Sequence, residues 1–432
     1  MAVAHNIINN ASTSLATASI AAGATTFVVA NALAVSAPFK ATFASTGEII
    51  EVGAISGTTW SSITRGAEGT TAAAYTAGAR LELRITAGHI TERRPFNVYP
   101  SSSPTANTLA IRAAIADGYV SLAPGTYTCA RTGSETALFE VASHVPGFTF
   151  LGNGATIVMA SGTPNTVDAF RFSYLVSARV EGFTLKPAVD GEGRHGIHFV
   201  PGWIGKARFS HITVGAIVNY TNDEYLEFSG ASIKLTSSVD GFFTNAFRDV
   251  HCWGNISLEN CGDSVIFDNV NINTTKNRIL FDCTMFPLAG ELGLYNMNGV
   301  GAGGAIRVVA SDDAAGMPSG SLNIVNCIFE TTGSSAPIAG ALCYIKDVLT
   351  PNITGSKFYT YGSSSGHAVQ LVNCHNATIW GNVLTGANNA ASNDLRVESS
   401  CTNTYPTAAL ARTSNVCLRN SVSIAGTTRA AI

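Results

Sequence analysis

The feature that most constrains the fold is a short phrase that recurs about every 29 residues. It consists of an apolar residue, any residue, a Gly or Asn, and a further apolar residue, as in Val180-Glu181-Gly182-Phe183. The third position of the phrase, once occupied by His, falls at Gly152, Gly182, His211, Gly241, Asn269, Asn296, Asn326, Gly355, Gly381 and Asn420. Such a series indicates a solenoid, in which each unit buries its apolar face only by stacking on its neighbours.

Each repeat unit also contains at least two short strands. Alternation such as Val270-Asn271-Ile272 has a period of two, which places one side chain inward and the next outward. Gly and Asn, and less often His, tolerate the positive φ that a tight corner requires. The sequence therefore predicts an all-β fold, a right-handed parallel β-helix of about ten rungs, where a rung is one turn of the coil. A β-propeller is the alternative, but its repeats run longer, at about 40–45 residues, and carry a signature that is absent here.

Composition excludes several classes of protein. Charged residues make up 12% of the 432 residues and the formal net charge is −3, which gives no electrostatic reason to expect nucleic acid as a partner. No apolar run approaches the roughly 20 residues of a membrane span, and the first residues lack the features of a signal peptide, so we expect no membrane insertion. The nine cysteines contain no C-x-x-C pair. They predict reduced, mostly buried thiols made in a host cytoplasm, with no metal site and no cofactor.

Residues 106–127 differ from the repeats that follow. They begin with helical spacing of apolar residues, and a helix at this point would cap the open end of the coil. The next phrase resembles the entry of pectate-lyase-like β-helices, especially those of phage tailspikes, where a short helix precedes V-x-L-P-x-G-x-Y. The matching residues are Val120, Leu122, Pro124, Gly125 and Tyr127, with Ala123 inserted before the proline.

Residues 1–92 contain short strands divided by Gly, Ser and Thr turns, which indicates a small all-β module. One run in it resembles the attachment modules of phage tail fibres and tailspikes. The matching residues are Gly47, Glu48, Glu51, Val52, Thr64, Arg65, Gly66, Glu68, Gly69, Thr70, Ala72, Tyr75 and Gly78. Arg65 and Glu68 bracket a glycine turn, where we expect a local ion pair. The predicted domains are thus a virion-attachment domain (1–92), a neck or linker (93–106), and a capping helix with the β-helix (107–432).

The resemblance implies a phage tailspike located in the virion. It also implies a homotrimer that docks on phage tail, adaptor or baseplate proteins through residues 1–92 and meets host surface polysaccharide. Two alternatives remain open: a non-catalytic receptor-binding or structural spike, and a secreted bacterial polysaccharide lyase. Whether the protein is a polysaccharide depolymerase, hydrolase or lyase, is left open, because a fold does not settle an activity.

Outward-pointing acids are the first catalytic candidates. The residue before each corner should face solvent, which places Asp240 and Asp268 on adjacent turns about 4.8 Å apart, with Glu181 two turns from Asp240. Carboxylates about 5 Å apart suit a retaining glycosidase, and about 6.5–9.5 Å suits an inverting one. The structural alternative is that acids beside corners accept hydrogen bonds from the turns.

Two loops supply further candidates. Glu192, Asp223 and Glu224 are rival catalytic acids that could flank one groove, and the same two loops also supply Asp190, Glu227 and His198. Arg194 and His195 are predicted to bind substrate there, and the alternative is a pair of solvated loops. Trp380, Trp203 and Tyr225 are predicted to stack on sugar rings, although isolated exposed aromatic residues are common.

Overall fold

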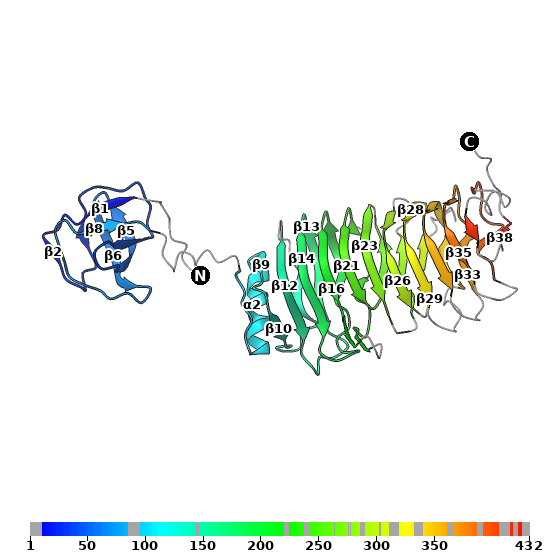
Figure 1. Ribbon diagram of the computed structural model, residues 1–432, viewed down its shortest axis with the longest axis horizontal. Helices are drawn as coiled ribbons and strands as arrows, with labels where there is room; N and C mark the ends of the chain where they lie inside the picture. Colours follow the sequence, from blue (N-terminus) through cyan, green and yellow to red (C-terminus); the bar gives the residue numbers. More distant parts are fainter. Residues whose placement is uncertain are drawn as a thin grey trace. The chain divides into compact units, whose positions relative to one another are not determined.

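The computed structural model divides the chain into two compact units, Met1–Pro95 and Phe96–Ile432 (Figure 1). It describes residues 11–84, 96–142, 147–219, 224–236, 242–262, 264–274, 276, 278–285, 290–301, 304–310, 319–331, 340–360, 366–386, 392–405, 415–417 and 422–425.

The amino-terminal unit is built from short antiparallel strands. They are β1 (Ser12–Ser14), β2 (Ser19–Ile20), β3 (Phe27–Val28), β4 (Phe39–Phe43), β5 (Ile49–Ser56), β6 (Thr59–Ala67), β7 (Tyr75–Thr76) and β8 (Arg80–Glu82). Six of them form one sheet in the order β1-β8-β4-β5-β6-β3, and β2 pairs with β7. The unit has its own core, in which Phe39, Phe43 and Trp60 are completely buried. The predicted small β module is therefore present.

Several residues of this unit's sequence motif donate hydrogen bonds to the carboxylate of buried Glu48. Arg65 donates from Nε to Glu48 Oε1 (2.7 Å) and from Nη2 to Oε2 (2.8 Å). The same carboxylate accepts from the backbone N–H groups of Gly66 (3.1 Å) and Ala73 (3.0 Å), and from the Tyr75 hydroxyl (2.9 Å). The spacing of the motif is thus explained by one fully satisfied buried carboxylate.

The predicted pairing of Arg65 with Glu68 is wrong. Arg65 turns inward to Glu48, and Glu68 forms its ion pair with Lys40 at 3.1 Å. Glu68 lies within the glycine turn with a φ of 54°.

The second unit begins with the helix α2 (Pro104–Ala116), three residues before the predicted start at 107. Ser103 caps it by accepting from the Ala106 N–H (3.3 Å). Its residues Ile111 and Ile115 are buried in the core of the unit, whereas Leu109 is 53% exposed. The helix therefore covers the first end of the coil, as expected. No helix within the described part of the chain has the length and apolar character of a membrane span.

The coil itself consists of two long parallel sheets (Figure 1). The main path of the 16-stranded sheet is β10 (Thr126–Cys129), β12 (Thr149–Met159), β14 (Arg179–Pro187), β16 (Arg208–Val214), β21 (Ala246–Trp253), β23 (Val265–Asn273), β26 (Asn298–Gly301), β29 (Ile328–Thr331), β32 (Lys357–Thr360), β35 (Val383–Thr385) and β37 (Val416–Cys417). Beside this path lie β9 (Tyr119–Ser121), β25 (Glu291–Tyr295), β28 (Ser319–Val325), β31 (Val348–Thr354) and β34 (Thr378–Trp380).

The 12-stranded sheet closes the other side of the coil. Its path is β11 (Ala137–Val141), β13 (Asp168–Val176), β15 (Ile197–Gly205), β19 (Ile233–Leu235), β22 (Ile256–Cys261), β24 (Phe281–Met285), β27 (Ile306–Ala310), β30 (Ala341–Lys346), β33 (His367–Val372), β36 (Leu395–Val397) and β38 (Val422–Ile424), with β20 (Phe242–Phe243) beside β15. A separate hairpin joins β17 (Ala216–Asn219) to β18 (Glu224–Leu226). The parallel β-solenoid has about 8 turns, and each main path holds eleven strands, short end strands included. The all-β class and the parallel β-helix predicted from the repeat are confirmed.

Most of the predicted corners have the backbone conformation that the pattern implies. Positive φ occurs at Gly182, His211, Asn269, Asn296, Asn326, Gly355 and Gly381. Two corners were misplaced. Asn153 (φ 50°) replaces Gly152, and Asp249 (φ 53°) lies opposite His211 where Gly241 was expected. Gly241 and Asn420 lie outside the described residues, and Phe242, which follows Gly241, pairs with Ile204 in the other sheet.

All nine cysteines are thiols outside any disulfide, and eight are buried. Burial raises the pKa of the Cys129 thiol to about 12 and that of the Cys327 thiol to about 11. Thiols of this kind are neutral packing groups at ordinary pH.

Candidate functional site

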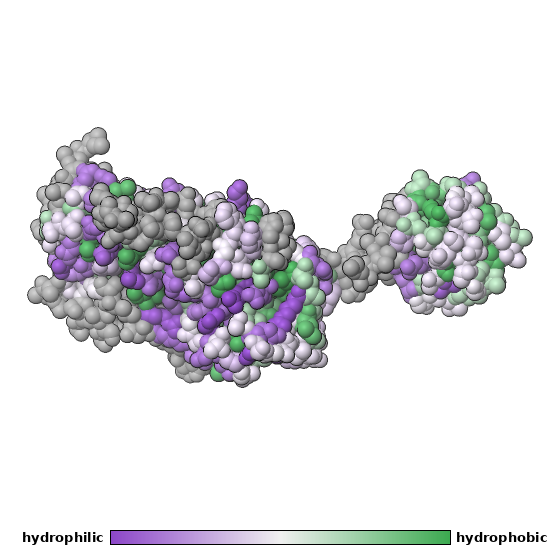
Figure 2. Space-filling model, turned by 180° about the vertical axis from the view of Figure 1, so that it is seen from behind, coloured by the Kyte–Doolittle hydropathy of each residue, from purple (hydrophilic) through white to green (hydrophobic). Residues whose placement is uncertain are grey.

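The residues before the corners form one column along the 16-stranded sheet. In strand register these are Glu181, Ser210, Arg248, Asp268, Tyr295, Val325, Thr354 and Trp380. All are exposed or half-buried, so the prediction that they face outward is confirmed. Figure 2 shows hydrophilic residues in bands across one face of this unit, with scattered hydrophobic residues between them.

The column does not bring the predicted catalytic acids together. Arg248, rather than Asp240, is the register neighbour of Asp268, and Asp240 lies outside the described residues. Glu181 is three strands from Asp268 along the column, or about 14 Å at the usual strand spacing. That separation exceeds both glycosidase geometries.

Each described acid of the column already has a hydrogen-bonding partner. Glu181 accepts from Arg179 at 2.7 and 2.5 Å, and Asp268 Oδ1 accepts from Asn296 Nδ2 at 2.9 Å. Asn296 is the corner residue of the following rung. These contacts are of the kind expected under the structural alternative to catalysis.

The two acidic loops do lie side by side. The Gly191 N–H donates to the Glu227 carbonyl (2.8 Å), and the Glu227 N–H donates to Asp190 Oδ1 (2.8 Å). Glu192 Oε1 accepts from the Gly162 N–H (2.8 Å), which ties its loop to the preceding turn. Asp223 and the side chain of Glu224 lie outside the described residues.

Asp190 and Glu227, one candidate acid from each loop, lie close to the same lysine. Lys276 Nζ lies 3.3 Å from Asp190 Oδ1 and 3.8 Å from Glu227 Oε2. Glu227 is completely buried, and the Thr274 hydroxyl lies 3.0 and 2.9 Å from its two oxygens. No sequence signal links these residues, because Lys276 is separated from them by 86 and 49 positions.

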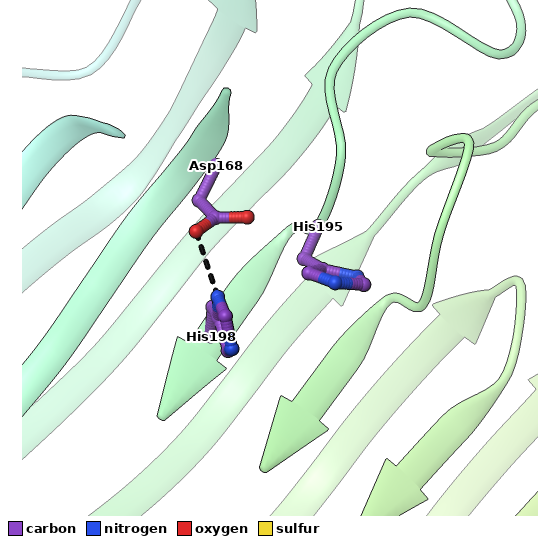
Figure 3. A group of neighbouring side chains, drawn as sticks. All are labelled: Asp168, His195 and His198. Carbon is purple, nitrogen blue, oxygen red and sulfur yellow. Dashed lines mark hydrogen bonds and ion pairs between the residues drawn. The ribbon is translucent and has the colours of Figure 1, made fainter. Parts of the chain in front are cut away.

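A polar cluster lies at the start of β13 and β15 (Figure 3). Asp168 begins β13, and its carboxylate is completely buried. It accepts from Arg194 Nε (2.8 Å) and Nη2 (2.5 Å), and its Oδ2 lies 2.7 Å from His198 Nδ1. His195 lies beside His198, with ring centroids 4.9 Å apart. Two predicted substrate-binding residues, Arg194 and His195, thus meet a buried acid and a second histidine.

Burial and hydrogen bonding shift the pKa values of Asp168 and His195. Burial raises the pKa of Asp168, but hydrogen bonds from Arg194 and His198 lower it by more, so its pKa lies below the ordinary value. Burial lowers the pKa of His195 to about 4. His195 is therefore neutral near pH 7, and its Nδ1 accepts from the Ala231 N–H (2.8 Å).

A shallow cleft of about 300 Å³ adjoins the cluster. Its lining residues are His195, Gly230, Ala231, Lys234, Asn255, Ser257 and Arg278. Lys234 Nζ donates to Ser257 Oγ (3.2 Å) and forms an ion pair with Glu259. Arg278 donates to Asn255 Oδ1 (2.9 Å) and to the Gly230 carbonyl. The cleft is therefore lined by two cations, a neutral imidazole, an amide and a hydroxyl.

Asp168, His195 and His198 also meet the distance requirement for a metal site, since their ligand atoms lie within 4.8 Å of one another. The Arg194 guanidinium contacts both Asp168 oxygens, and His198 has partners on both ring nitrogens. A metal ion would have to displace the arginine cation and break these bonds. The residues therefore suit a hydrogen-bonded relay better than a metal centre.

The predicted aromatic residues are spread over separate places. Trp380 is 47% exposed and stacks on Tyr405 with centroids 5.8 Å apart, and Trp203 is 44% exposed on β15. Tyr225 is half-buried against Trp253, at 4.8 Å. None of the three lines the cleft.

The site residues that the sequence did not single out are Asp168, Lys234 and Arg278, whereas His198 was already a candidate of the first loop. His198 and Lys234 occupy the alternating outward positions of "GIHFV" and "SIKL" and are register neighbours. A strand alignment could have found this pair, but not Asp168 or Arg278, whose roles depend on loop paths.

Comparisons with known proteins give two solved structures. The chain is similar to the tailspike protein gp49 from Pseudomonas phage LKA1, with 14% identity and a TM-score of 0.22, over 92% of this chain and 66% of that one. It is also similar to the gp54 tailspike of Acinetobacter baumannii bacteriophage AP22 in complex with A. baumannii capsular saccharide, with 10% identity and a TM-score of 0.21, over 94% and 66%. The chain thus spans slightly less than two thirds of each. TM-scores this low give no residue correspondence. Neither a family model nor a curated protein matches the sequence.

Proposed function

We propose that this chain is a phage tailspike that binds polysaccharide of the host cell surface through the cleft beside β19. The observation that carries this proposal is the set of donors and acceptors on an outward sheet face, with Lys234 and Arg278 as cations. Sugar hydroxyls and carboxylates are bound by such groups, and charge-assisted hydrogen bonds are the stronger ones.

The assembly is part of the same proposal. The protein is a virion component made in the host cytoplasm and acts as a homotrimer. It docks on tail, adaptor or baseplate proteins through residues 1–92. The match of the buried Glu48 network to the motif of attachment modules supports this role, because the motif residues are those that hold the unit together.

Replacing Lys234 by Met should weaken binding of host polysaccharide by about 10- to 100-fold, since one charged hydrogen bond contributes roughly 1.5–3 kcal/mol. The measurement is titration calorimetry with purified capsular or O-antigen polysaccharide. Lys346→Met is the matched control, because Lys346 lies on the same sheet outside the cleft and pairs with Asp347 at 3.4 Å. Equal losses in both variants, or none in Lys234→Met, would contradict the assignment of the cleft.

A second candidate function is cleavage of that polysaccharide, by hydrolysis or by elimination. Asp190 and Glu227 favour it, because acid–base cleavage of a glycan uses carboxyl groups close together, and these two lie 3.3 and 3.8 Å from the same ammonium group, that of Lys276. Asp190 is half-exposed and open to substrate, whereas Glu227 is buried. Glu192, Asp223, Glu224 and Asp240 remain candidate acids of the same proposal.

Asp190→Asn should lower the cleavage rate about 100-fold or more, because it removes an acid or base while keeping the side-chain volume. New reducing ends or unsaturated sugars are measured after incubation with host polysaccharide. Asp268→Asn is the control and should leave the rate unchanged, since Asp268 is bound to a corner Asn. Absence of any release from host glycans would remove the cleavage hypothesis while leaving the binding hypothesis intact.

A further inference from the structure

We propose that Thr236, His198 and Asp168 form a nucleophile–base–carboxylate relay that hydrolyses acyl esters, such as O-acyl groups on a polysaccharide. His198 joins the other two residues through its two ring nitrogens. Its Nδ1 lies 2.7 Å from Asp168 Oδ2, and its Nε2 lies 2.8 Å from Thr236 Oγ1. Both distances fall within the range required for an activated hydroxyl nucleophile. The proposal goes beyond glycan binding and does not require cleavage of the glycan chain.

The direction of the hydrogen bonds follows from the charges. An anionic Asp168 can only accept, so the proton between it and His198 belongs to Nδ1. In the neutral ring Nε2 is then an acceptor, and the Thr236 hydroxyl donates to it. The Thr236 oxygen is therefore paired with a base in the orientation that proton removal needs.

The surrounding strands hold the relay in place. Arg194 donates hydrogen bonds to both oxygens of Asp168, and His198 is only 5% exposed. The Thr236 N–H donates to the Phe199 carbonyl (2.9 Å), which fixes the backbone of the nucleophile. Thr236 itself is half-buried, so the relay runs from a buried acid to a partly exposed residue.

The cleft places a cation near the reacting centre. Lys234 lies two residues before Thr236 and lines the cleft. Strand alternation puts the two side chains on the same outward face. An ammonium at that position is a suitable donor to the oxyanion of a tetrahedral intermediate.

The reaction balances without a co-reactant other than water. Thr236 Oγ attacks the ester carbonyl carbon, and its proton passes to His198 Nε2. The carbon–oxygen bond to the sugar breaks, and the sugar hydroxyl leaves with that proton. Water then attacks the acyl-threonine, again through His198, and releases the carboxylic acid and free Thr236.

The test uses the full chain with p-nitrophenyl acetate and with an O-acetylated polysaccharide. We expect hydrolysis by the wild-type protein, a loss of about 100-fold or more in Thr236→Ala, and retention in Thr236→Ser. Thr184→Ala, on the outward face of β14, is the control and should keep full activity. Peptide mass spectrometry should find the trapped acetyl group on Thr236.

A structural relay would behave differently. If the relay only holds the fold together, Thr236→Ala will be less stable to heat than the wild type, and the wild type will not hydrolyse esters. This result would overturn the proposal. Acetyl groups found only on other residues, or equal rates in wild type and Thr236→Ala, would also overturn it. Polysaccharide binding is measured separately by calorimetry, so loss of the esterase hypothesis and loss of the binding hypothesis are distinguishable.

Discussion

Replacing Glu48 by Gln should destabilise the amino-terminal unit by about 3–5 kcal/mol, because the change leaves the Arg65 guanidinium buried without its counter-ion. The side chains of Glu48 and Arg65 are 0% and 5% exposed. An amide at position 48 would also present N–H groups to donors that now meet oxygen. Hydrogen exchange of the β5 and β6 amides in the full chain, followed in increasing urea, measures the loss.

The matched control for Glu48→Gln is Arg80→Gln in the same unit. Arg80 pairs with Glu82 at 2.9 Å, but the arginine is 64% exposed. Exposed pairs of this kind contribute at most about 1 kcal/mol. Similar losses in the two variants would show that the buried network does not hold the unit together.

The Glu48 network also predicts a dependence on pH. Burial raises the pKa of Glu48, but Arg65, the Ala73 N–H and Tyr75 lower it by more, so the folded pKa lies below the ordinary 4.5. A carboxyl with a lowered folded pKa adds stability above its ordinary value, and that stability is lost as pH falls through the folded pKa. Glu48→Gln should therefore flatten the acid limb of the stability curve.

The coil could be predicted from the sequence because the residue at each corner must adopt a positive φ. Positive φ restricts a position mostly to Gly and Asn, so Asn269, Asn296 and Asn326 mark successive rungs in the sequence itself. The pattern failed where a corner uses another residue. Asp249 fills the corner opposite His211, and "VDGFF" supplied a false match nearby.

The site was less predictable than the fold. Arg194 and His195 were found because they stand in a polar loop insertion, and the structure brings both to the cluster. Asp168 had no signal, since a single acid at the start of a strand is common. Its partners Arg194 and His198 lie on the following rung, and only the stacking of rungs shows that the three groups meet.

Phe209→Ala should destabilise the coil by about 3–5 kcal/mol, the usual cost of deleting a buried phenyl ring. Phe209 is 1% exposed and stacks on Phe247 with centroids 4.8 Å apart. It also contacts Phe199 at 5.2 Å and Phe172 at 6.1 Å, so the ring joins both sheets. The measurement is hydrogen exchange along the β-solenoid.

The loss of protection from hydrogen exchange should be confined to the strands near Phe209. Each rung contacts mainly its neighbours, so amides of β14, β16 and β21 should exchange faster while those of β30 and β33 keep their protection. Phe209→Leu, which fills most of the space, should show a smaller change at the same strands. A uniform loss of protection from β12 to β36 would mean that the coil opens as one cooperative block, and the view of independent stacked rungs would then be wrong.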